Sequence, residues 1–245
     1  DGKSLAYTGF DNKKMATQIS HMYVMNLKTR KIREIKTKLD RGVSNISWSG
    51  DSKSIIFNYA DKGNTKLAQT TLKGKNNILT NNLGRSYSLT TDGRFVFITT
   101  RPDLPSDLAV GKIGSGQTTI ITSINSDLLT HKTLGTVEEI WYKSSHDGLD
   151  IQGWIIKPPG FDPSKKYPLI IKIHGGPFSN YGNRFYLEKQ LMAAEGQKIG
   201  WASELSAAPA VAGDPPIIPR MFTAALDEGF SEVARQDRAE AKAMQ

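Results

Sequence analysis

GTVEEIWYKSSHDGLDIQGWIIKPPGFDPSKKYPLIIKIHGG, residues 135–176, holds three apolar runs separated by polar turns. The first two runs flank Asp147-Gly148, a pair that favours tight turns, and together they predict a β-hairpin. Four prolines between residues 158 and 168 then predict an irregular loop, because proline fixes φ and lacks an N–H donor. The third run, residues 169–173, is short and rich in isoleucine, which is typical of a strand buried in a mixed or parallel sheet.

A helix is predicted over residues 183–196, soon after this strand. Apolar residues recur there at helical spacing, and Gly196 supplies a stop signal. The apolar positions are Phe185, Leu187, Leu191 and Met192. The order of hairpin, strand, glycine loop and helix predicts the beginning of an α/β sheet domain.

The strand ends in His174-Gly175-Gly176-Pro177, and the glycines Gly175 and Gly176 are the candidate functional residues. Consecutive glycines let the backbone approach a ligand closely with its N–H groups exposed. In acyl-transfer hydrolases such a loop supplies one donor of the oxyanion hole, which stabilises the charge that develops on the tetrahedral intermediate. The alternative is a plain strand-to-helix turn.

The N-terminal half contains a repeat whose turns begin at residues 1, 51 and 92. Each unit opens with an aspartate-centred turn and a β-rich run, which read DGKSLAYTGF (1–10), SGDSKSIIFNYA (49–60) and TDGRFVFITT (91–100). Two more apolar runs follow in each unit, at 21–27 and 31–37, 66–72 and 76–82, and 108–113 and 118–124. The period of about 40 to 50 residues fits four antiparallel strands of about six residues in each unit, and such units stack on their neighbours as propeller blades. A β-sandwich is the alternative, but it does not require the same turn in every unit.

The repeat therefore predicts a partial β-propeller of about three blades, in which Trp48 contributes to core packing. Closed propellers have about four to eight blades, so we expect this set to be incomplete. Asp1-Gly2-Lys3 also reads as the middle of a turn. Both observations lead us to expect an N-terminus that is not the natural one.

Composition excludes several classes of function. The 245 residues contain no cysteine and only four scattered histidines, so no disulfide, metal site or cofactor is expected. No apolar run approaches the roughly 18 residues of a membrane span. The formal charge of +8 comes from scattered lysines and arginines without stacking aromatics or a known motif. A nucleic-acid partner is therefore not expected.

Blades followed by residues 136–197 resemble the prolyl oligopeptidase family of serine peptidases, above all its acylaminoacyl-peptidase and dipeptidyl-peptidase-like branch. The resemblance covers roughly residues 1–197. It implies a propeller that gates an α/β-hydrolase domain, a peptide substrate and a Ser-Asp-His triad. It also implies that a backbone amide of the Gly175-Gly176 pair donates to the oxyanion, while His174 only opens the loop.

This resemblance sets the expected domain limits. We expect a partial β-propeller at 1–134, the N-terminal part of an α/β-hydrolase domain at 135–197, and an atypical tail of unknown structure at 198–245. The tail is rich in alanine and proline and shows no strand periodicity. We expect the chain to be truncated at both ends relative to the family.

No triad residue is predicted in this chain. A Gly-x-Ser-x-Gly elbow is missing from the sequence, and GWASEL around Ser203 lacks its second glycine. No histidine follows His174, so no later serine has a base to activate it. Ser145-His146-Asp147 is no substitute, because neighbouring side chains on a hairpin alternate faces.

The sequence thus predicts a serine peptidase by family, acting on short peptides or acylated N-terminal residues, of which this chain is an inactive fragment. The alternative function is a non-catalytic propeller module that binds a peptide or protein partner. Substrate specificity, oligomeric state and compartment are not predicted, beyond a slight preference for the periplasm or secretion.

Overall fold

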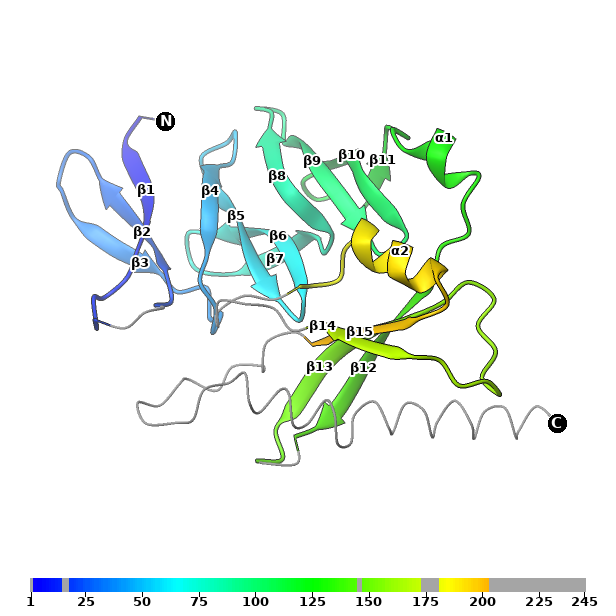
Figure 1. The fold of residues 1–245 in the computed structure, drawn as a ribbon. Coiled ribbons are helices and arrows are strands. Elements are labelled where there is room, and N and C mark those ends of the chain that lie inside the picture. The colour runs from blue at the N-terminus through cyan, green and yellow to red at the C-terminus, as the bar shows by residue number, and fades with distance from the viewer. Residues whose placement is uncertain (1, 15–17, 145–146, 173–180, 203–245) are drawn as a thin grey trace. The chain divides into compact units, whose positions relative to one another are not determined.

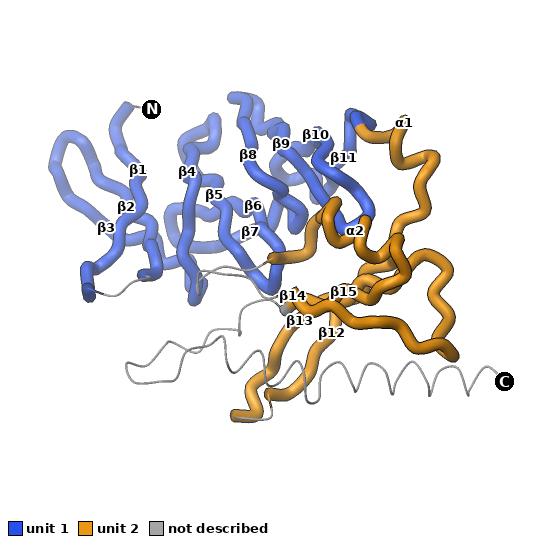
Figure 2. Tube along the Cα trace, viewed as in Figure 1, with its two compact units in different colours: residues 1–124 blue, residues 125–245 orange. Residues whose placement is uncertain are grey.

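The computed structural model describes residues 2–14, 18–144, 147–172 and 181–202 (Figure 1). The chain forms two compact units, residues 1–124 and 125–245 (Figure 2). The first unit contains the repeats, and the second contains the predicted hairpin, strand and helix.

The first unit consists of three antiparallel sheets, each built from strands that follow one another along the chain. The first sheet has the strands β1 (Ser4–Gly9), β2 (His21–Asn26) and β3 (Ile32–Ile35). The second has β4 (Ser44–Trp48), β5 (Ser54–Asp61), β6 (Asn64–Thr71) and β7 (Asn76–Thr80). The third has β8 (Leu83–Leu89), β9 (Arg94–Arg101), β10 (Leu104–Lys112) and β11 (Thr118–Ile120). These sheets are the predicted blades, two of them with four strands and the first with three.

The repeated aspartate turn is closed by the same contact in the second and third blades. In the second blade the Ser49 hydroxyl donates a hydrogen bond to Asp51 at 2.6 Å. In the third blade the Thr90 hydroxyl donates to Asp92. This bond, together with those from Arg94, lowers the pKa of Asp92 to about 2. A hydroxyl two residues before the aspartate therefore fixes the start of the strand that follows, which explains why the turn recurs at the same place.

Neighbouring blades share hydrophobic cores. Successive side chains of a strand point to opposite faces, and β5 uses both faces. Ile55 and Phe57 join the core shared with the first blade. Ile56 joins the core shared with the third. Trp48 packs, partly buried, against the first of these cores, as predicted.

The second unit is built around a mixed sheet. Its elements are α1 (Ser126–Leu129), β12 (Thr136–Lys143), β13 (Asp150–Lys157), β14 (Leu169–Lys172), α2 (Leu187–Ala194) and β15 (Lys198–Ala202). The strand order is β12-β13-β15-β14, and only the β14–β15 pair is parallel. Parallel neighbours need a crossover, and α2 lies within it. The predicted hairpin, strand and helix are confirmed.

Strand β15 was not predicted, and it corrects the expectation that residues 198–245 show no strand periodicity. This strand lies between β13 and β14, and its residues Ile199 and Trp201 are fully buried. The run KIGWA holds only two large apolar residues, Ile199 and Trp201, which is too short an alternation to predict a strand. It is also interrupted by Gly200. The predicted domain limits at residues 134 and 197 stay predictions.

The buried face of α2 also differs from the predicted one. Leu187 and Leu191 are 58% and 59% exposed, whereas Lys189, Gln190 and Ala193 are buried. The Gln190 side chain accepts a hydrogen bond from the Gly135 N–H at 2.8 Å and donates to the Gly135 carbonyl at 3.3 Å. Polar side chains with specific partners thus form the buried face of the helix. The two leucines that the apolar spacing placed on that face are exposed to solvent instead. The helix is shorter than predicted and is followed by Gly196, whose φ is +80°.

Candidate functional site

The predicted site lies at the carboxyl end of strand β14. This strand ends at Lys172, and the described chain resumes at Tyr181 and continues to α2. His174, Gly175 and Gly176 lie between them, outside the described residues. In α/β sheets ligands bind beyond the carboxyl ends of the strands. The sequence position of the His-Gly-Gly-Pro run fits this rule, and the oxyanion role of the two glycines stays a prediction.

An ion pair joins the end of β14 to the first turn of α2. The Lys172 Nζ lies 2.5 Å from the Glu188 Oε1. Lys172 is the last residue of the strand, and Glu188 is the second residue of the helix. A carboxylate in the first turn also interacts favourably with the positive end of the helix dipole. The position before the His-Gly-Gly-Pro run is therefore linked to α2.

The next residue of α2 makes a second link, to the position after that run. Lys189 is only 2% exposed, and its ammonium faces three aromatic rings. The Nζ lies 4.2 Å from the ring centroid of Tyr181, and 3.7 Å from those of Tyr186 and Trp201. Its Nζ has no hydrogen-bond partner among the residues that the structure describes. We call Lys189, Tyr181, Tyr186 and Trp201 the aromatic cage.

Burial shifts the titration of the cage. Loss of hydration lowers the pKa of Lys189 to about 7, and the charge of Lys172 adds to this effect. Glu188 opposes it by favouring the charged form. Burial also raises the pKa of Tyr186 to about 12. A buried amine whose pKa is lowered in this way is a candidate functional group.

The β12–β13 hairpin does not assemble a triad from its described residues. Ser145 and His146 lie outside them. The Asp147 Oδ1 accepts a hydrogen bond from the Leu149 N–H at 3.3 Å, and Gly148 has a φ of +70°. Asp147 therefore stabilises the turn, as the Asp-Gly pair predicts.

A concavity of about 360 Å³ lies in the first unit, between the second and third blades. Ser47, Trp48 and Gly50 line it from the end of β4, and Tyr87 and Thr91 line it from β8 and the turn after it. A Cβ added to Gly50 would lie 2.0 Å from the Thr91 carbonyl oxygen, so the two turns pack backbone against backbone. Residues with hydroxyl groups and two aromatic residues thus line the concavity.

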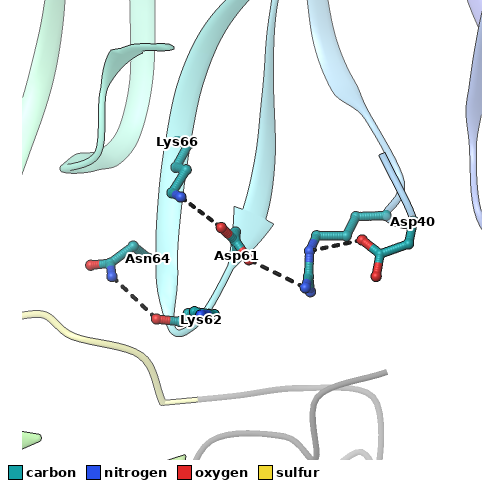
Figure 3. Close-up of polar contacts among 6 residues, drawn as sticks. Asp40, Asp61, Lys62, Asn64 and Lys66 are labelled. Atoms are coloured by element: carbon teal, nitrogen blue, oxygen red, sulfur yellow. Dashed lines mark hydrogen bonds and ion pairs between the residues drawn. The ribbon is translucent and has the colours of Figure 1, made fainter. Parts of the chain in front are cut away.

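Figure 3 shows an ionic network in the first unit that joins the β5–β6 hairpin to the connection between β3 and β4. Asp61 binds the Lys66 Nζ at 2.6 Å and the Arg41 guanidinium at 3.2 Å. Arg41 also pairs with Asp40 at 3.2 Å. Burial alone would raise the pKa of Asp61, but the hydrogen bond and charge of Lys66 and the charge of Arg41 lower it. The network ties the β5–β6 hairpin to the connection that precedes its blade, and it includes no candidate nucleophile.

The lowered pKa gives this network a predictable dependence on pH. Since the native state favours the charged form of Asp61, its contribution is present above the unfolded pKa of 3.8 and is lost as the pH falls through the native value. We expect Asp61→Asn to reduce the free energy of unfolding by about 1–3 kcal/mol at pH 7. The deficit should shrink as the pH falls below about 4, where the carboxyl of the unfolded chain is protonated first, and it should vanish only below the lower native pKa.

Urea unfolding of both proteins at pH 7 and pH 3 measures this change. The matched control is Asp103→Asn, because Asp103 pairs with Arg101 at an exposed position. This control should change stability by about 1 kcal/mol or less at either pH. An Asp61→Asn deficit that is the same at both pH values would contradict the electrostatic explanation.

Neither a metal site nor a membrane helix is found in the described part of the chain. No three histidine, aspartate or glutamate side chains gather there in a way that could hold a metal ion. None of the helices described is long and apolar enough to cross a bilayer.

Sequence reasoning missed the aromatic cage, although part of its signal is visible. Tyr186 and Lys189 are three residues apart, a spacing that places side chains on one side of a helical turn. The remaining signal is not local, because Trp201 belongs to β15, which was not predicted as a strand.

Comparison with known proteins gives a consistent set of relatives. No known family profile matches this chain. Dipeptidyl-peptidase 5 of Porphyromonas gingivalis is 30% identical over 203 residues, which cover 80% of this chain and 29% of that protein. The uncharacterized peptidase YuxL of Bacillus subtilis is 31% identical over 155 residues, which cover 62% of this chain and 23% of that protein.

The solved structures agree with the fold described above. The acylaminoacyl peptidase of Pyrococcus horikoshii matches with a TM-score of 0.66 and 23% identity, over 82% of this chain and 31% of that structure. The predicted fold, a partial propeller followed by the beginning of an α/β-hydrolase domain, is thereby confirmed. The chain spans less than a third of the length of each of these relatives.

Proposed function

The chain belongs to the prolyl oligopeptidase family of serine peptidases, and from this premise we propose that the whole protein hydrolyses short peptides or acylated N-terminal residues. The observation that carries the proposal is the order of elements along one chain. Propeller blades precede a β14–α2–β15 crossover, and the His-Gly-Gly-Pro run lies within that crossover. Two relatives, a dipeptidyl-peptidase and an acylaminoacyl peptidase, support the two substrate classes by their names.

Within that reaction, residues 1–245 supply blades and one part of the catalytic machinery. A backbone amide of the Gly175-Gly176 pair donates to the oxyanion, which stabilises the tetrahedral intermediate as the peptide bond is attacked. The nucleophile, acid and base come from elsewhere in the whole protein. The sequence has no Gly-x-Ser-x-Gly elbow and no histidine after His174. We therefore propose that residues 1–245 alone do not cleave peptides.

A fluorophosphonate probe tests both parts of this proposal. The purified 245-residue chain should not be labelled and should not release p-nitroaniline from aminoacyl p-nitroanilides. The whole protein should do both. Serine-dependent labelling of the 245-residue chain would overturn the proposed lack of activity, and an unlabelled whole protein would overturn the assignment as a serine peptidase.

A second function is favoured by the concavity between the second and third blades. Its hydroxyl groups and the rings of Trp48 and Tyr87 suit a peptide segment. In this alternative the chain is a non-catalytic module that binds a peptide or protein partner. Titration of the 245-residue chain with a pool of short peptides measures this binding, which a binding module shows without a catalytic triad. Trp48→Ala should weaken the affinity for the peptides.

A further inference from the structure

The two cores between the blades follow one pattern. The second strand of a blade directs two bulky side chains toward the preceding blade. In the second blade these are Ile55 and Phe57, which lie in the core shared with the first blade. In the third blade they are Phe95 and Phe97, which lie in the core shared with the second. All four side chains are at most 2% exposed, so each core depends on the bulky face of the later blade.

The earlier blade contributes aliphatic side chains to the same core. Met22 of β2 lies in the first core, and Leu67 of β6 lies in the second. From the neighbouring strands, Ala6 of β1 packs against the first core, and Ile56 of β5 lies in the second. Both interfaces therefore join an aliphatic face of one blade to the bulky face of the next blade.

The first blade carries a bulky face of its own on the side away from the second blade. Successive side chains of a strand alternate, so Leu5 and Tyr7 point away from the core that Ala6 contacts. The Tyr7 ring stacks on Tyr23 with the ring centroids 5.4 Å apart. Leu5 is 48% exposed, whereas Ile55, at the same distance from its own aspartate turn, is fully buried. The register of β1, β2 and β3 groups the residues that we call the first-blade face, which are Leu5, Tyr7, Tyr23, Met25 and Ile32.

The third blade, on the other side of the second (Figure 1), carries an aliphatic face. Val96 and Ile98 of β9 alternate with the two buried phenylalanines of that strand, so they point away from the second blade. The register pairs Val96 with Val110 and Ile98 with Leu108 of β10. Val96 is 36% exposed, and the other three side chains are partly exposed. We call these four residues the third-blade face.

The third-blade face repeats the aliphatic face of the second blade. Val96 holds the position of Ile56, since each directly precedes a buried phenylalanine of its strand. Leu108 holds the position of Leu67, since each directly precedes the alanine that pairs with that phenylalanine. Ile56 and Leu67 are fully buried in the core that the third blade completes. The third-blade face is therefore suited to a bulky face of the same kind.

We propose that these two faces form an interface between copies of this chain, in which the first-blade face of one copy packs on the third-blade face of a second copy. The contact repeats an interface that the chain already contains twice. A head-to-tail interface forms a closed ring when the rotation between the copies closes. Two copies with three blades each give a ring of six, and closed propellers have about four to eight blades. The proposal uses only the blades and does not depend on the peptidase function.

A second copy is the occupant because one chain presents both halves of the interface. Exposed apolar faces favour association. The surface that fits the first-blade face is an aliphatic blade face, and the chain exposes one on its third blade. In a ring of two copies every such face is buried, whereas an unrelated partner on one face would leave the other in water.

Sedimentation velocity of the 245-residue chain over a range of concentrations tests the proposal. The chain should sediment as a dimer and dissociate into single copies on dilution. Leu5→Asp and Val96→Asp should each weaken dimerisation by about a hundredfold or more, because either change buries a carboxylate in an apolar interface. Both side chains are exposed in the single chain, so each variant should keep the circular dichroism of the unaltered chain.

Ile78→Asp is the matched control. Ile78 is 44% exposed and belongs to the second blade, which carries neither of the two faces. This variant introduces the same charge at an exposed apolar position of the same unit. It should dimerise as the unaltered chain does.

A mixture of the two variants gives the decisive measurement. In a ring of Leu5→Asp copies alone, both interfaces contain an aspartate, and the same holds for Val96→Asp. A mixed ring places both aspartates in one interface and leaves the other interface unaltered. The mixture should therefore form dimers at concentrations at which each variant alone stays single.

Three results would overturn the proposal. One is an unaltered chain that stays single at every concentration. Another is an association that only one of the two variants weakens, because it would join two identical faces. The third is growth beyond two copies, because the ring would then not close. None of these results concerns the peptidase function, which the fluorophosphonate probe tests on the whole protein, so the two failures are distinguishable.

Discussion

Phe57→Ala is expected to lower the free energy of unfolding of the first unit by about 3–5 kcal/mol. Phe57 has no exposed surface and lies in the core shared by the first and second blades. Its ring stacks on Tyr59, with centroids 5.8 Å apart. Truncation removes buried apolar area and leaves a cavity between two packed sheets, which cannot close without shifting both. The loss should appear as faster exchange of the β5 and β6 amides in low urea.

The matched control for this substitution is Ile78→Ala, because Ile78 belongs to the same blade but is exposed. It should cost about 0.5 kcal/mol or less, as surface substitutions usually do. Equal losses for the two variants would mean that the core between the blades does not carry the stability of the unit. The β13 amides of the second unit serve as an internal reference in the same samples.

Trp154→Ala is expected to lower the free energy of unfolding of the second unit by about 3–5 kcal/mol. Trp154 is 1% exposed and stacks on Trp201 at 6.1 Å between ring centroids. The two rings belong to paired strands, β13 and β15, where residues 154 and 201 lie directly opposite each other. Removing one ring therefore weakens the pairing that holds the missed strand in the sheet, in addition to creating a cavity.

Urea unfolding followed by circular dichroism measures this effect, with exchange of the β13 amides used to assign the transition. Trp141→Ala is the control, since Trp141 belongs to the neighbouring strand β12 and is 45% exposed. A loss below about 1 kcal/mol for Trp154→Ala, or an equal loss for Trp141→Ala, would contradict the central role of the Trp154–Trp201 stack.

Local signals in the sequence predicted most of the fold. The aspartate turns predicted the blades, because each turn is stabilised by contacts within a few residues. The hydrogen bond from the Ser49 hydroxyl to Asp51 is an example. The hairpin was predictable for the same reason, since Asp147-Gly148 favours the turn by itself. Strand β15 was not predictable from such signals, because its place is fixed by pairing with β13 and β14. The predicted buried face of α2 was wrong, because Gln190 bonds to the distant Gly135 and Lys189 packs on Trp201 of the strand that was not predicted.

The oxyanion role of the Gly175-Gly176 pair stays a prediction, because both glycines lie outside the described residues. The absence of a triad from this chain is likewise a prediction, which rests only on the order of residues in the sequence. The links through Glu188 and Lys189 were not predicted. They depend on the direction of side chains from α2, and on Trp201, whose strand was missed.

The position of β15 has a consequence for how the chain acquires its structure during synthesis. Every sheet of the first unit pairs strands that are neighbours in sequence, so each blade can form soon after its own residues leave the ribosome. The mixed sheet of the second unit differs, because β13 and β14 do not pair with each other. Each of them pairs with β15, which lies between them. The sheet cannot be completed until β15 (Lys198–Ala202) has been synthesised. Until then the apolar residues that pack against Trp201, such as Trp154, stay exposed. The nascent chain is thus most exposed to misassociation in its second unit, at the point where the candidate site is being built.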